Sequence, residues 1–118
     1  MAKPKNCISV EKARELQNNW ISTRAVHLEK GQGVLDHREV MFSLADLEEY
    51  LEYVKSESAK QGVDSPGIRI YFSAYDHDDS DKATVFLAPA KGTDVNADNN
   101  YQIEPFNWGV GGLPPNNY

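Results

Sequence analysis

A short acidic loop between two apolar runs holds the residues whose spacing could bind a metal ion. In "DHDDSD" (76–81), Asp76, Asp78 and Ser80 have the spacing of the first three ligands of an EF-hand calcium loop. The pattern then fails, because the sixth position is Asp81 instead of glycine and the twelfth lies inside an apolar run. We therefore predict a solvated hairpin turn that holds no metal. A looser oxygen-ligand site for Ca²⁺ or Mg²⁺ at Asp76, Asp78 and Ser80 stays open.

The other residues that could do chemistry are scattered along the chain. His27, His37 and His77 lie in three different segments, without the close spacing of paired metal ligands. Cys7 has no neighbouring base in the sequence. A pairing with a histidine stays open, although a small apolar residue near a helix start is the simpler interpretation. No G-x-G-x-x-G, G-x-S-x-G, H-E-x-x-H or C-x-x-C motif occurs. The sequence favours a non-enzymatic protein without a cofactor, and leaves the question of catalysis open.

Aromatic and arginine side chains on one strand form the best candidate for a binding surface. Arg69, Tyr71 and Tyr75 alternate along "IRIYFSAY" and share its outer face. Such residues are typical of protein interfaces. Phe106 and Trp108 in the C-terminal segment can join this surface. Two interpretations remain: the segment covers the strand within one chain, or a partner or second subunit does so.

Charge is divided unevenly along the chain, whose net charge is -6. Residues 1–30 carry six Lys and Arg against three Glu, and residues 31–118 carry six against fifteen Asp and Glu. The acidic body disfavours nucleic acid, because phosphates would be repelled. We expect the basic segment to dock on its own acidic body or on a neighbour's. Contact of this segment with nucleic acid is the weaker alternative.

The hydropathy and cysteine content predict a cytoplasmic protein without membrane contact. No apolar run approaches the ~20 residues of a membrane span. The N-terminal residues lack the apolar stretch of a secretory signal. The single Cys7 cannot form an internal disulfide.

Two helices are expected before the strands. The first covers residues 9–26, with Ser9 as its N-cap, bends or ends near residue 24, and is followed by a breaker at 29–33. A short strand at 38–42 precedes the second helix at 43–61, which Ser43 caps and Gly62 ends. Its expected apolar stripe comprises Leu44, Leu47, Tyr50, Leu51 and Val54.

The strands 68–75 and 83–89 are expected to pair as an antiparallel hairpin with a long loop. Both helices would then pack on its dry face, formed by Ile68, Ile70, Phe72 and Ala74. The predicted fold is α+β: two helices on a small antiparallel sheet, with an irregular C-terminal segment. We expect one domain over 1–118, with a core at 9–92 and the irregular segment at 93–118. Residues 101–118 are too apolar for a free tail, so Phe106 and Trp108 should pack against the hairpin in the same chain or a partner.

Three stretches, "GIRIYFSAY", "ATVFLAPA" and "PFNWGVGGLPP", resemble small uncharacterised bacterial proteins of similar length. The resemblance covers residues 9–118 and implies a bacterial, cytosolic origin. It carries no functional residue over to this chain.

The preferred function is a non-enzymatic interaction or accessory domain that self-associates or binds a protein partner. The alternative is a small-molecule-binding protein or enzyme, with a pocket between the outer face of strand 68–75 and the C-terminal segment. Arg69, Tyr71, Tyr75 and Trp108 would line that pocket. A third idea is an acidic inhibitor or immunity-type protein that occupies a basic partner.

Overall fold

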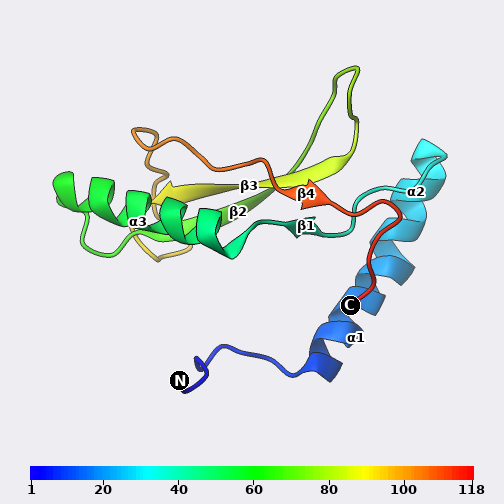
Figure 1. The fold of residues 1–118 in the computed structure, drawn as a ribbon, viewed down its shortest axis with the longest axis horizontal. Helices are drawn as coiled ribbons and strands as arrows, with labels where there is room; N and C mark the ends of the chain where they lie inside the picture. The colour runs from blue at the N-terminus through cyan, green and yellow to red at the C-terminus, as the bar shows by residue number, and fades with distance from the viewer.

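The computed structural model describes residues 1–118 and shows an α+β fold, as expected (Figure 1). Its helical segments are α1 (Val10–Trp20), the π-helical turn η1 (Ile21–Ala25), α2 (Val26–Gln32) and α3 (Leu44–Lys60). Its strands are β1 (Val40–Met41), β2 (Gly67–Ala74), β3 (Ala83–Ala90) and β4 (Val110–Gly111). No helix combines the length and the apolar character that crossing a membrane requires.

The first helix is longer than the sequence predicts. Ser9 caps it by accepting a hydrogen bond from the Lys12 backbone N–H at 3.0 Å. A π-helical turn follows, where the Thr23 hydroxyl donates to the Asn19 carbonyl at 2.5 Å. This local bond competes with the regular helical pattern. The helix then continues to Gln32 and ends at Gly33, whose φ of 76° is left-handed. Of the expected break at 29–33, only Gly33 interrupts the helix.

α3 begins and ends where the sequence predicts. The Ser43 hydroxyl accepts from the Asp46 backbone N–H at 3.0 Å, and Gly62 follows the helix with φ 76°. The expected stripe is wrong in part. Leu47, Tyr50 and Val54 pack on the hairpin, and Ser58, one turn further on, is also buried. Two other members of that stripe, Leu44 and Leu51, are 70% and 42% exposed, because they lie beside the contact line.

β2 and β3 form the expected antiparallel hairpin, with Gly67 opposite Ala90 and Ala74 opposite Ala83. β3 is bordered on its other side by the C-terminal segment, through backbone bonds between Leu87 and Phe106. The core lies between α3 and this hairpin. It comprises Tyr50, Val54, Leu87 and Ile103, flanked by Phe42, Leu47, Ile68, Val85 and Phe106.

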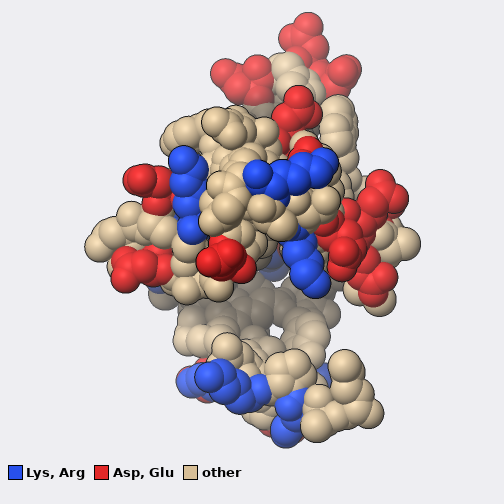
Figure 2. All heavy atoms as spheres, turned by 90° about the vertical axis from the view of Figure 1, so that its left-hand side faces the viewer, with Lys and Arg blue, Asp and Glu red and all other residues tan.

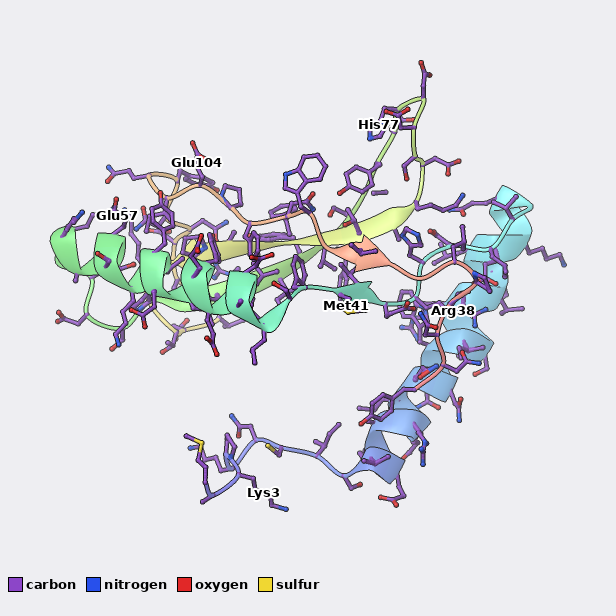
Figure 3. All side chains as sticks on the ribbon, in the orientation of Figure 1. Lys3, Arg38, Met41, Glu57, His77 and Glu104 are labelled. Atoms are coloured by element: carbon purple, nitrogen blue, oxygen red, sulfur yellow. The ribbon has the colours of Figure 1, made fainter.

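Only α3 lies along the hairpin, whereas α1 and α2 lie to one side of it (Figure 1). The expectation that both helices cover the dry face is therefore wrong for the first helix. Neither α1 nor α2 has a buried residue. The radius of gyration is 16.6 Å, against about 13 Å for a compact 100-residue domain. Arg38, which is labelled in Figure 3, holds α2 at this position through a bidentate ion pair with Glu29 at 2.9 and 3.1 Å.

A second sheet joins distant parts of the chain. The strand expected at 38–42 is only Val40–Met41, and it pairs with β4 instead of the hairpin. Two glycines permit this approach. A Cβ atom at Gly109 would overlap Val40 and Phe42, and one at Gly111 would overlap the His37 ring. The glycines of "GVGG" therefore serve close packing between β1 and the C-terminal segment.

Candidate functional site

The outer face of β2 is covered by the chain itself. Arg69 donates to the Asn99 side-chain oxygen at 2.6 Å and to the Val95 carbonyl at 3.0 Å. The Asn99 amide in turn donates to the Tyr71 hydroxyl at 2.7 Å. Two of the expected surface residues are thus occupied by the loop that follows β3. For them the structure favours cover within the chain over direct contact with a partner.

Tyr75 is held by the same C-terminal segment further along. Its hydroxyl donates to the Asn107 side-chain oxygen at 2.7 Å, and the Asn107 amide donates to the Val85 carbonyl at 2.8 Å. Phe106 turns inward, with its ring centroid 4.8 Å from that of Tyr50. Trp108 does not pack on the hairpin: its side chain is 86% exposed. The structure therefore separates Phe106 and Trp108, which the sequence places on one surface.

An open pocket of about 310 Å³ lies on this outer face. Tyr71 and Phe86 form one wall as a stacked pair, with ring centroids 5.0 Å apart and planes at 16°. The lining comprises Tyr71, Phe86, Ala88, Pro89, Asn99, Asn100, Tyr101, Ile103 and Pro105. Of the residues expected to line such a pocket, only Tyr71 does so. The lining offers aromatic rings, amides and the hydroxyls of Tyr71 and Tyr101, and has no carboxylate, imidazole, thiol or amine.

The acidic loop is closed on itself. His77 and Ser80 exchange backbone hydrogen bonds at 3.1 and 3.2 Å, and the His77 ring accepts from the Asp79 backbone N–H at 3.2 Å. A hydrogen bond from Lys82, followed by its charge, lowers the pKa of the exposed Asp81 carboxyl. No three His, Cys, Asp or Glu side chains gather anywhere in the chain as metal ligands would. Figure 3 shows His77 on this loop, away from the helices.

A buried carboxylate that sequence reasoning missed is Asp36. It accepts hydrogen bonds from the backbone N–H groups of His37 and Ala83 at 2.7 and 2.8 Å, and from the Gln32 amide at 3.3 Å. The His37 ring lies 3.0 Å from the Ala83 carbonyl. These bonds fasten the segment after α2 to the start of β3. The sequence signal is only the Asp-His dipeptide, which recurs at 76–77, so it could not single out Asp36.

Tyr50 links the helix, the hairpin and the C-terminal segment. Its hydroxyl donates to the carbonyls of Glu104 and Leu87, at 2.9 and 3.4 Å. Burial, with a smaller contribution from Tyr53, raises the pKa of Tyr50 to about 12. Its role is therefore that of a neutral donor within the core.

Apolar side chains remain largely exposed over the rest of the surface. Only 11 of the 118 residues are buried. The exposed set includes Leu16, Val26 and Leu28 on the first helix, Ile70 and Phe72 on β2, and Met41, Val95, Tyr101, Trp108 and Val110 elsewhere. Such extensive exposure of apolar groups is typical of interaction surfaces.

No protein-family model, curated protein or solved structure matches this chain. The fold and the site define an α+β protein with an aromatic-walled open pocket and an extensive exposed apolar surface.

Proposed function

We propose that this chain is a non-enzymatic protein-interaction domain that self-associates. The observation that carries the proposal is the small core: 11 buried residues, beside many large apolar side chains in water. Burying an apolar side chain stabilises a complex by about 1.5–3 kcal/mol. Association of two such surfaces is therefore favourable, because it buries these side chains.

The first helix adds to this surface. Its exposed apolar side chains are Leu16 and Trp20 on α1 and Val26 and Leu28 on α2. Its contacts with the C-terminus run through Gln17, which bonds Asn117 and the Tyr118 backbone. Helices that lack tertiary packing are marginal in water. Residues 1–30, which we call the basic arm, are therefore best stabilised by a partner.

The charge distribution favours a second copy as that partner. Residues 1–30 carry a net charge of +3 and residues 31–118 one of -9. Figure 2 shows mainly basic side chains on the lower part, where the N-terminal segment and α1 lie, and acidic side chains, with basic ones among them, on the body above. Glu29–Arg38 is the one ion pair between the two parts, and it uses an acidic residue of the first part. Residues 1–24 form no ion pair with the body, since Lys12 pairs only with Glu15. The basic arm of one chain is therefore free to meet the acidic body of another. We place this association in the cytoplasm, where the single, exposed Cys7 stays reduced.

Light scattering over a range of protein concentrations tests the proposal. We expect the average mass to rise from that of one chain toward a multiple of it. The part that depends on the basic arm should weaken at high salt, because exposed charges are screened. A mass equal to one chain at every concentration would contradict self-association.

A second candidate function is the binding of a small molecule in the 310 Å³ pocket, which the stacked Tyr71 and Phe86 favour. A screen of aromatic fragments by NMR tests it. Binding there should shift the signals of Tyr71 and Tyr101 and be lost in Tyr101→Ser, whose side chain is exposed. If fragments leave these signals unmoved, this second candidate is excluded.

A further inference from the structure

We infer that two copies of this chain pair through β2, edge to edge and antiparallel, about a two-fold axis at Tyr71. The inference rests on the proposed self-association and assigns its main surface, to which the charge contact of the basic arm is an addition. It follows from the direction of the backbone groups of β2, from their side chains, and from the register that these allow.

The backbone pattern shows which groups of β2 face outward. On β3, Leu87 exchanges both its backbone bonds with Phe106, on the side away from β2. Its partner across the hairpin, Ile70, is therefore not hydrogen-bonded to it, and the N–H and C=O of Ile70 also point outward. The same alternation turns every second residue of β2 outward. These residues are Ile68, Ile70, Phe72 and Ala74.

The two edges of the hairpin differ in what covers them. On β3, the outward groups find partners within the chain: the Ala83 N–H bonds Asp36, the Val85 carbonyl bonds Asn107, and the Pro89 carbonyl bonds Asn100. On β2, the outward backbone groups have no partner, and no strand lies beside them. An open edge of this length is a template for another strand.

The side chains on this edge are apolar and uncharged. Ile68 packs on the core, so Ile70 and Phe72 project from the same face of the sheet as α3. α3 leaves them in water, with Ile70 61% and Phe72 89% exposed. Proteins protect such edges with lysine, proline or a bulge, and β2 has none of these. Its one charged residue, Arg69, is held on the opposite face by Asn99.

Self-pairing has one best register. With Tyr71 on the two-fold axis, Ile70 faces Phe72 of the other copy and Ile68 faces Ala74, so all the outward residues meet outward residues. A register with Ile70 on the axis places Pro66, which has no N–H, opposite Ala74. A register with Phe72 on the axis places the acidic Asp76 opposite Ile68.

The axis at Tyr71 also makes the strand complementary to its own copy. Arg69 comes opposite Ser73, so no like charges meet, and the apolar strip of Ile70 and Phe72 continues from one copy to the next. The two-fold axis places both α3 helices on the same face, on either side of this strip. An edge pairing of this size buries less than the ~1,200 Å² of a standard interface. We therefore expect a dimer that dissociates on dilution.

Substitution of an exposed edge residue tests the inference. Phe72→Lys places like charges near the axis without touching the monomer's core, so light scattering should show that the dimer is lost. The melting curve of dilute protein, to which association does not contribute, should stay that of the wild type. Val95→Lys is the control, because Val95 is 85% exposed and lies off the edge. This variant should form the dimer as the wild type does.

A disulfide test reads the register directly. In a Cys7→Ser background, Tyr71→Cys should form a disulfide-linked dimer on mild oxidation, because residues that face each other across non-hydrogen-bonded positions lie about 4.5 Å apart at Cα. Ser73→Cys is the matched control on the same face. Its two copies would lie about 13 Å apart along the strands, beyond disulfide reach.

The outcomes separate this inference from the proposed function. A wild type that stays monomeric at all concentrations overturns both. A wild type that self-associates while Phe72→Lys does so equally overturns only the assignment to β2. Equal cross-linking at positions 71 and 73 overturns the register.

Discussion

Polar residues of the candidate site mainly make structural contacts within the chain. Arg69 and Tyr75 hold the C-terminal segment on the hairpin, and Asp36 holds the start of β3. Each has its partners inside the chain. Residue type and spacing predicted that Arg69 and Tyr75 share a strand face. Their partners lie about thirty positions away, and no local pattern indicates such contacts.

Tyr50 should make stability fall at alkaline pH. Its pKa is raised from 10.0 to about 12 in the folded chain, so the folded state keeps a proton that the unfolded state loses first. The stabilising contribution is complete below pH 10 and is lost as pH rises through 12. Urea midpoints measured across this range should fall more steeply for the wild type than for Tyr50→Phe. Parallel slopes would contradict the buried, neutral tyrosine.

Asp36→Ala should destabilise the fold by about 1–3 kcal/mol, because it leaves the backbone N–H groups of His37 and Ala83 without an acceptor. Asp79→Ala in the exposed acidic loop is the matched control and should lie within about 0.5 kcal/mol of the wild type. Urea denaturation measures both. Equal effects would show that Asp36 does not fasten the start of β3.

The acidic loop should bind no structural metal, since its broken ligand spacing is accompanied by internal bonds of His77. Thermal melts in EDTA and in millimolar Ca²⁺ should therefore coincide. Binding to the folded state at ~100 times Kd would add about 2.7 kcal/mol and raise the melting temperature by several degrees. A rise of that size in calcium would restore the cation site at Asp76, Asp78 and Ser80.

At the scale of elements, the ends of α3 were predictable and its buried face was predictable only in part. Ser43 and Gly62 act through local geometry, which the sequence contains. The spacing of the apolar residues indicates that one side of the helix is apolar. It does not decide which of several neighbouring lines of residues along that side is buried. The position of the hairpin and of Phe106 selects the line through Tyr50 and Val54 and leaves Leu51 beside it.

Two leucines test this selection. Leu87→Ala should cost about 2–5 kcal/mol, because Leu87 is buried in the core of α3 and the hairpin. Leu51→Ala makes the same chemical change at a half-exposed site and should cost clearly less. Urea melts at low protein concentration compare the two without a contribution from association. A larger loss at Leu51 would return that residue to the centre of the stripe.

At the scale of the whole molecule, the sequence predicts the hairpin, the helices and an irregular C-terminal segment, but not their arrangement. The placement of α1 and α2 depends on the Glu29–Arg38 pair, and the second sheet depends on glycines that admit β1 beside β4. These contacts join positions that neither helical nor strand periodicity relates to each other. The same arrangement leaves one edge of the hairpin covered and the other open.

Amide hydrogen exchange of β2, followed by NMR at low and high protein concentration, tests the central claim most directly. The amides of Arg69, Tyr71 and Ser73 point toward β3 and should be protected at both concentrations. The amides of Ile70 and Phe72 point outward. They should exchange freely in dilute protein and become protected as the concentration rises. If they exchange freely at every concentration while the average mass increases, self-association does not use this edge, and pairing through β2 is contradicted.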